Sequence, residues 1–229
     1  MRIASKYLMI LLLVSCNPKE TFAPIQVNVS GALREIMHQG KLAATIGLDT
    51  LDMQNMYGLG ALDSLKGEVM VLNGVPFKSA VVDSTVTMIQ SSSGASLFVY
   101  SQVKMWDTLS VDSFDDISEL VRSKIEERNQ TEPTPFILLG SPAQINYHVI
   151  NFDPEVSDIS NHKEGAFNGA FTNEPVILLG FYATNAKGQY THHDSNVHMH
   201  VIDEAKTMMG HVDDLLPGTG NFKLLLPRS

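Results

Sequence analysis

Val197-His198-Met199-His200-Val201, followed by a third histidine in Met208-Met209-Gly210-His211, is the stretch around which this chain is organised. Alternate residues of a β-strand point to the same side, so the two valines and the methionine would face a core, while His198 and His200 would share the opposite face. If the chain reverses near residues 205–206, His211 lies opposite His200, with their Cβ atoms within about 5.5 Å. The stretch therefore predicts a β-hairpin.

The three histidines of this hairpin, His198, His200 and His211, also predict a metal site. Three protein ligands with one position left for solvent or substrate are typical of a catalytic metal, whereas structural zinc sites are usually closed by four ligands. Imidazole suits zinc, copper, iron and nickel, so the spacing alone leaves the identity of the metal open. The alternative is a set of polar side chains on an exposed strand face.

Length and charge narrow the classes of function. The chain has 229 residues, enough for one domain with two lobes or for two small domains. Its formal net charge is −9, and no basic patch stands out that would neutralise phosphates. We therefore expect no nucleic-acid partner.

The first residues resemble a bacterial lipoprotein signal peptide over 1–16. Arg2 and Lys6 precede an apolar run that is too short to span a bilayer comfortably, and the run ends in the lipobox-like Leu13-Val14-Ser15-Cys16. Cys16 is the single cysteine of the chain, and it stands where the lipid would be attached. We expect an exported protein that is held to a bacterial membrane by a lipid anchor, with residues 17–25 as a tether.

Apolar spacing and turn residues predict the elements that follow. Asn73-Gly74 predicts a tight turn between two strands of a hairpin, because both residues accept positive φ angles. Ser30 is the expected N-cap of the first helix and Gly40 its stop. The predicted helices cover 27–37 and 113–128, the predicted strands include 68–72, 80–90 and 96–105, and a long loop is predicted over 153–173.

The prolines of 131–135 suggest a boundary between an N-terminal lobe, 26–132, and a C-terminal metal-binding lobe, 133–229. The second lobe contains a short internal repeat, since Pro135-Phe136-Ile137-Leu138-Leu139-Gly140 recurs in similar form as Pro175-Val176-Ile177-Leu178-Leu179-Gly180. Each copy is followed by an Asn-x-His segment, at 146–148 and 196–198. Chance similarity between strands and an ancient duplication would each explain this repeat.

Two blocks resemble the bacterial α-acetolactate decarboxylases. The first is the glycine-rich Gly58-Leu59-Gly60-Ala61-Leu62-Asp63-Ser64-Leu65-Lys66-Gly67-Glu68-Val69. The second runs from Gly180-Phe181-Tyr182-Ala183-Thr184 through Ala186-Lys187-Gly188 to His198-Met199-His200 and Gly210-His211. The resemblance extends over most of the chain from about Val27.

The resemblance implies an α+β, β-rich fold with two lobes, mixed or antiparallel sheets and a few helices. It also implies a carboxy-lyase that converts 2-acetolactate, a small 2-hydroxy-3-oxo acid, into acetoin. Zinc on His198, His200 and His211 would act as a Lewis acid that stabilises the enediolate, and Glu68 would be the catalytic acid/base. A homodimer is left open.

Three positions depart from the family pattern. Ala61 stands where the family has threonine, and the strand expected over 147–153 lacks the family's active-site arginine. His148 or Asn151 occupies that place and would contact the substrate instead. The glutamate that the family carries in a C-terminal extension has no counterpart before Ser229.

Two alternative functions are consistent with the same residues. The departures favour a non-catalytic, lipid-anchored protein that keeps the fold and binds a metal or another ligand. A cupin-like metalloenzyme would use Glu204 beside His198 and His200, although a second cupin motif is absent after His211. His192-His193, just before the metal strand, would supply a further ligand or lie in an exposed turn.

Overall fold

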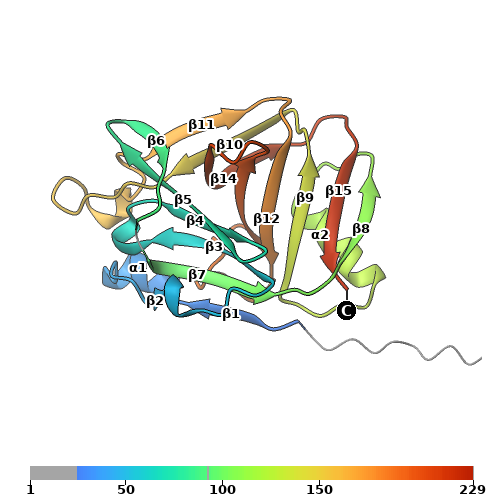
Figure 1. Ribbon diagram of the computed structural model, residues 1–229, viewed down its shortest axis with the longest axis horizontal. Coiled ribbons are helices and arrows are strands. Elements are labelled where there is room, and N and C mark those ends of the chain that lie inside the picture. Colours follow the sequence, from blue (N-terminus) through green and yellow to red (C-terminus); the bar gives the residue numbers. More distant parts are fainter. Residues whose placement is uncertain (1–24, 92, 229) are drawn as a thin grey trace, which may run out of the picture.

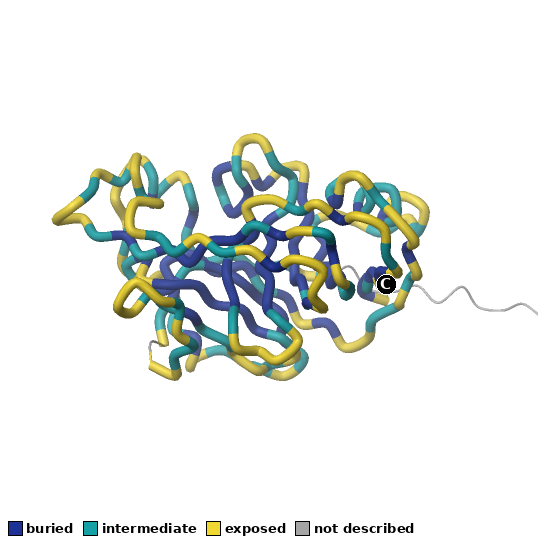
Figure 2. The backbone as a smooth tube through the Cα atoms, turned by 90° about the horizontal axis from the view of Figure 1, so that it is seen from above, coloured by how far each residue is buried: buried dark blue, intermediate teal, exposed yellow. Residues whose placement is uncertain are grey.

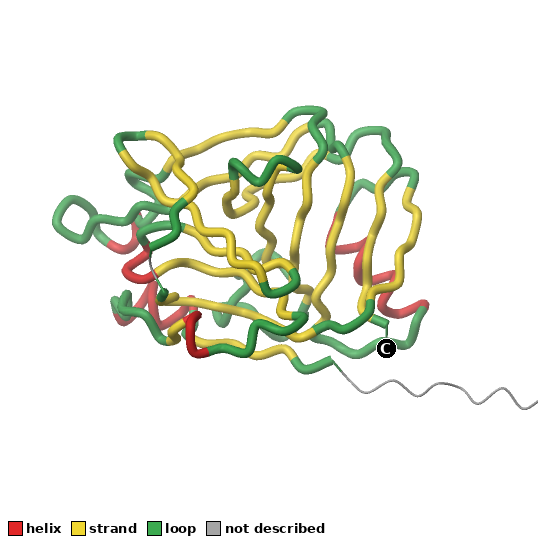
Figure 3. The backbone as a smooth tube through the Cα atoms, viewed as in Figure 1, coloured by secondary structure: helices red, strands yellow, loops and turns green. Residues whose placement is uncertain are grey.

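Two antiparallel sheets account for most of residues 25–91 and 93–228, the part of the chain that the computed structural model describes (Figures 1 and 3). The first sheet has the strand order β1-β7-β3-β4-β5-β6, with β2 paired to β7. Its strands are β1 (Val27–Ser30), β2 (Ile46–Gly47), β3 (Met56–Leu62), β4 (Glu68–Leu72), β5 (Val75–Val82), β6 (Thr85–Met88) and β7 (Gly94–Gln102).

The second sheet follows along the chain and has the order β11-β10-β14-β13-β12-β9-β15-β8. Its strands are β8 (Trp106–Val111), β9 (Thr134–Gly140), β10 (Gln144–Val149), β11 (Phe167–Phe171), β12 (Val176–Tyr182), β13 (Val197–Asp203), β14 (Met209–Leu216) and β15 (Phe222–Pro227). In Figure 1 β3, β4 and β7 run across the view, whereas β12, β9 and β15 run up it. The β-rich fold with antiparallel sheets that the family resemblance implies is thus confirmed.

The described residues contain two α-helices, α1 (Leu33–Gln39) and α2 (Ile117–Glu127), and three short 3₁₀ segments, η1 (Leu48–Thr50), η2 (Asp63–Leu65) and η3 (Ile159–Asn161). α2 lies within the predicted 113–128 and presents Ile117, Val121 and Ile125 to the second sheet. It begins at Ile117 because Asp116 accepts a hydrogen bond from the Glu119 N–H at 2.8 Å, as an N-cap does. No helix of the described ranges is long and apolar enough to cross a membrane.

Alternation along the strands separates the apolar side chains into layers. In β13, Val201 packs in the cluster that includes α2, whereas its neighbour Ile202 packs in the cluster between the two sheets. In β4, Met70 faces that same layer between the sheets, and Val69 packs on the far side of the first sheet. The buried segments therefore run through the middle of the molecule (Figure 2). The even-numbered residues of β4 point toward the second sheet, and those of β13 point toward the first sheet.

The β4–β5 hairpin matches its prediction. Asn73 has φ +48° and Gly74 φ +81°, the left-handed values that a type I′ turn requires. Leu72 and Val75 pair directly across this turn. The turn fixes the register of β4, and it therefore also fixes which face of the sheet Glu68 occupies.

The predicted helix over 27–37 is wrong in its first part. Val27-Asn28-Val29-Ser30 forms β1 against β7, because a β-branched alternating segment gains sheet pairing there. Ser30 is not the N-cap, since its hydroxyl contacts Thr45 and the helix begins after Ala32. The first N–H groups of α1 donate instead to the carbonyls of Gln189 and Gly188, at 2.8 and 2.7 Å. Gly40 ends the helix with φ +62°, as expected.

Two other expectations differ from the structure. The loop predicted over 153–173 contains η3 and the edge strand β11. The chain passes from the first sheet to the second between β7 and β8, near residue 104, whereas the proline segment suggested a boundary at 132. β8 pairs with β15, and α2 packs on the second sheet, so residues 106–127 lie with the C-terminal strands.

Replacing Gly60 by alanine should destabilise the fold by about 3 kcal/mol or more. A Cβ at position 60 in β3 would lie 1.9 Å from the carbonyl oxygen of Leu97 in β7, and backbone cannot yield as a flexible side chain does. Urea unfolding should measure this loss. Gly220→Ala is the matched control, because its Cβ would meet only ordinary contacts of 3.6 Å or more. Equal stability of both variants would contradict the close approach of β3 and β7.

Candidate metal centre

The β13–β14 hairpin brings the three histidines together in the predicted register. His200 pairs directly with His211, and the turn between the strands includes Lys206 with φ +60°. His198 and His200 lie on the face of β13 that carries Ile202, so they point into the layer between the sheets. They are 6% and 0% exposed, which excludes the alternative of a solvent-exposed polar face.

Distances among the imidazoles suit a shared ion. One nitrogen from each of His198, His200 and His211 lies within 4.8 Å of the others. His198 Nε2 and His211 Nδ1 are 3.2 Å apart. Two nitrogens bound tetrahedrally at about 2.0–2.1 Å from zinc would be about 3.3 Å apart. The hairpin therefore already has the spacing of a metal-binding set.

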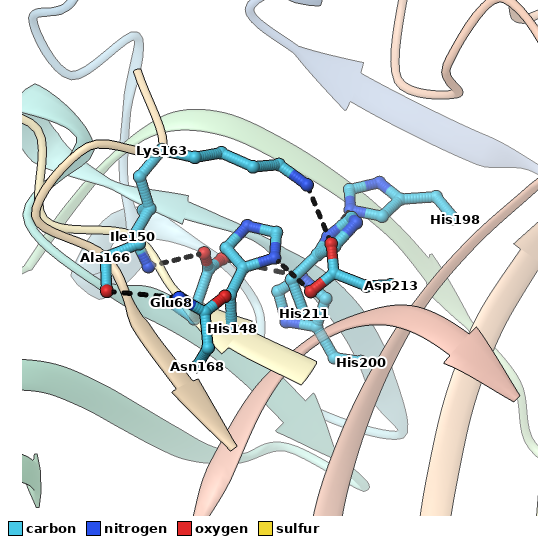
Figure 4. A network of polar contacts seen from close by, with 10 residues as sticks. All are labelled: Glu68, His148, Ile150, Lys163, Ala166, Asn168, His198, His200, His211 and Asp213. Carbon is cyan, nitrogen blue, oxygen red and sulfur yellow. Dashed lines mark hydrogen bonds and ion pairs between the residues drawn. The ribbon is translucent and has the colours of Figure 1, made fainter. Parts of the chain in front are cut away.

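Glu68 reaches the same place from the other sheet. Its Oε2 lies 3.5 Å from His200 Nε2, and its Oε1 accepts a hydrogen bond from the Ile150 N–H at 3.3 Å (Figure 4). Gly67 permits this placement, because its φ is +136° and a Cβ there would lie 2.1 Å from the Ser79 carbonyl oxygen. Burial raises the pKa of Glu68 well above its usual range, although the Ile150 N–H opposes this shift.

The protonation of the histidines also fits a metal. Burial lowers the pKa of His198 to about 3 and lowers the pKa values of His200 and His211 well below the usual range. The imidazoles are therefore neutral at physiological pH and keep the lone pairs that metal binding requires. Three neutral imidazoles form a donor set that suits zinc and that leaves a fourth position open.

A second polar group borders the histidines and joins the predicted His148 to Asp213 and Lys163, two residues for which the sequence predicted no role. His148 pairs with His211 across β10 and β14, and its Nδ1 lies 2.8 Å from Asp213 Oδ2. Lys163 Nζ lies 2.7 Å from the other oxygen of Asp213 (Figure 4). Asp213 is the extra residue of a β-bulge in β14, where Asn146 pairs with Asp214 and the next residue pairs with Val212. Bulges re-aim side chains in this way, and periodicity alone does not reveal them.

A cavity of about 60 Å³ lies beside the histidines. Its apolar lining includes Leu33, Ile36 and Met37 of α1 together with Ala61 and Ile150. The polar lining comprises Glu68, His148, His162, Lys163, His192, His198 and His211. A metal held by the histidines would therefore lie beside a small cavity that is lined by both polar and apolar side chains.

The other predicted site residues have mixed outcomes. His148 lines the cavity, whereas Asn151 is not among its lining residues. Of His192-His193, the first lines the cavity, and the second is exposed. Glu204 lies exposed in the turn after β13, so the cupin interpretation, which needed it beside the histidines, is wrong. Cys16 lies outside the described residues.

Comparisons with known proteins agree with this geometry. The family model described as alpha-acetolactate decarboxylase matches residues 26–225. A solved alpha-acetolactate decarboxylase from Bacillus subtilis strain 168 is similar with a TM-score of 0.70 and 17% identity, covering 89% of this chain and 86% of that one. No curated protein matches the chain.

A Staphylococcus aureus protein of unknown function, described as similar to alpha-acetolactate decarboxylase, also has a TM-score of 0.70, with 14% identity. That similarity covers 87% of this chain and 85% of the other. At such identities the solved structures support the fold alone, and the match over 26–225 supports the family.

Replacing His200 by alanine should abolish stoichiometric zinc binding, because it removes one of the three imidazoles and leaves two ligands. Elemental analysis after loading with zinc and dialysis is the measurement. His193→Ala, a change at an exposed histidine of the same segment, should retain one zinc per chain. Full zinc content in the His200 variant would exclude this centre.

Proposed function

This chain belongs to the alpha-acetolactate decarboxylase family, and from that premise we propose that it catalyses the metal-dependent decarboxylation of 2-acetolactate to acetoin. One observation carries the proposal: three histidines of one sheet, two of them buried, gather beside the carboxyl group of Glu68 from the other sheet, and His198, His211 and Glu68 line a common cavity. A carboxy-lyase of this kind needs a place to receive negative charge and an acid/base beside it. The cavity offers both.

His198, His200 and His211 would hold the metal, for which zinc is our proposal. A bound divalent cation supplies Lewis-acid stabilisation of the negative charge that develops on oxygen when carbon dioxide leaves. The three imidazoles are neutral, so they add no positive charge of their own. Because they are only three protein ligands, they leave one coordination position of the metal for substrate oxygens.

Glu68 is the acid/base that the family pattern retains. When the bond to the carboxyl carbon breaks, its electron pair stays with the substrate, and one proton must be returned to carbon. Glu68 Oε2, 3.5 Å from His200 Nε2, is close enough to the histidine set to deliver that proton. The Ile150 N–H holds the other carboxyl oxygen and thereby fixes the orientation of the group.

The apolar lining would bind the methyl groups of acetolactate and exclude water. Leu33 and Ile36 of α1 and Ile150 after β10 belong to this lining. Exclusion of water strengthens every electrostatic interaction inside the chamber. Ala61, in place of the family's threonine, adds to the apolar lining.

The second candidate function is a non-catalytic protein that keeps the fold and the metal. The absence of an arginine between 147 and 153 favours it, because a polar group of the family's site is then missing. Under this alternative the protein would bind zinc and still leave acetolactate unchanged.

The zinc-loaded protein should form acetoin from 2-acetolactate faster than the spontaneous background, and Glu68→Gln should lower kcat about 100-fold or more, because an amide cannot carry the proton. Acetoin formation and zinc content are the two measurements. Glu127→Gln, on the exposed side of α2, should match the unaltered protein. Background rates with a full complement of zinc would overturn the proposed activity and favour the non-catalytic alternative.

We also propose that the protein is exported and anchored through Cys16. The basic residues, the short apolar run and the lipobox-like segment support this proposal. Acyl chains contribute about 0.8 kcal/mol per buried methylene, so a multiply acylated cysteine would hold the protein firmly at a membrane surface.

Expressed in a bacterial host, the full chain should incorporate labelled palmitate and sediment with membranes, whereas Cys16→Ser should lose the label and leave the membrane fraction. The serine differs from cysteine only in the atom that receives the lipid. Equal labelling of both forms would exclude lipidation at Cys16.

A further inference from the structure

Lys163 lies between two hollows of the protein. One, which we call the inner hollow, is the cavity of about 60 Å³ beside the histidines, and the other, which we call the outer hollow, has a volume of about 310 Å³. Both are lined by Lys163, His192 and His211. Lys163 is therefore within reach of a small molecule in either hollow.

The side chain of Lys163 is held at this border by contacts with the second sheet. Its Nζ lies 2.7 Å from Asp213 Oδ1, and Asp213 in turn contacts His148 (Figure 4). The lysine side chain is still 47% exposed, so solvent and solutes reach it. An ammonium has three N–H donors, and the bond to Asp213 uses one of them.

Charge within the two hollows is otherwise negative or neutral. Glu68 lines the inner hollow, and Asp194 and Asp213 line the outer one. Among the described residues that line either hollow, Lys163 is the lysine or arginine that supplies a permanent positive charge. Its charge is also felt inside the cavity: burial and then Lys163 lower the pKa of His192, and Lys163 opposes slightly the rise that burial causes in the pKa of Glu68.

We propose that Lys163 is a specificity-determining residue that binds the carboxylate of the 2-hydroxy-3-oxo acid at the edge of the metal cavity that it lines, an inference that rests on the proposed function. The carboxylate is the group lost as carbon dioxide, so this contact exists in the substrate complex and disappears in the neutral product. The lysine would thus favour capture of the acid and release of the ketone. Because it stabilises the ground state, its loss should raise KM far more than it changes kcat.

A purely structural role is the competing explanation. Lys163 would then only tie the segment after η3 to Asp213 of β14. In that case removal of the charge would loosen the cavity and weaken acidic and neutral ligands alike. The two roles therefore differ in what they predict for a pair of matched probes.

The test measures binding to the zinc-loaded full chain by calorimetry. The acidic probe is 2-hydroxy-2-methylpropanoate, and the neutral probe is 3-hydroxybutan-2-one, the reaction product. Lys163→Met should weaken the acid about tenfold and change the neutral probe less than twofold, since it deletes a charge-assisted hydrogen bond. Lys163→Arg should restore most of the affinity for the acid. Lys223→Met, at an exposed position of β15, is the control and should alter neither probe.

Salt provides a measurement that needs no variant. Raising the ionic strength should weaken binding of the acid to the unaltered protein and leave the neutral probe unchanged. Unchanged affinity of the Lys163→Met variant for the acid, an equal loss for both probes, or no binding of the acid at all would overturn the role of Lys163. Binding of the acid that depends on Lys163, without any acetoin formed, would instead overturn the proposed function alone.

Discussion

The enclosure of three neutral imidazoles and the carboxyl group of Glu68 between two apolar sheets is the constraint on which the rest of the site depends. A buried polar atom without a partner costs about 1–3 kcal/mol, and burial disfavours the charged form of each group. In this protein the layers on either side supply the apolar packing, with Ile202 and Met209 next to the histidines and Met70 next to Glu68. The strands that position the polar groups thus also supply the apolar packing that offsets the unfavourable free energy of burying them. A bound cation would stabilise these groups further.

Several parts of this arrangement follow from the sequence. The two-residue period of β13 places His198 and His200 on one face, and a hairpin of simple register sets His211 opposite His200. The turn at Asn73-Gly74 likewise follows from its demand for positive φ angles. In each case one local rule is sufficient, because the residues concerned lie on the same strand or on two strands joined by a short turn.

Other parts depend on contacts between distant segments. The approach of Glu68 to His200 joins two sheets, and only the family resemblance pointed to it. Asp213 reaches His148 because of a bulge, and Lys163 comes from a segment for which an unstructured loop was predicted. The residue at which α1 begins does not follow from local sequence, because its first N–H groups donate to the carbonyls of Gly188 and Gln189, far along the chain, and not to a local cap.

The bulge in β14 also divides that strand into two parts with different freedom to change. On one side of it His211 is paired with both His200 and His148, so a shift by a single residue would displace contacts with two neighbouring strands at once. On the other side, beyond Asp214, the strand pairs only with β10 and ends at Leu216, which is exposed. Insertions and deletions at the outer end of β14 can therefore be tolerated, because they leave the strand pairing of His211 unchanged.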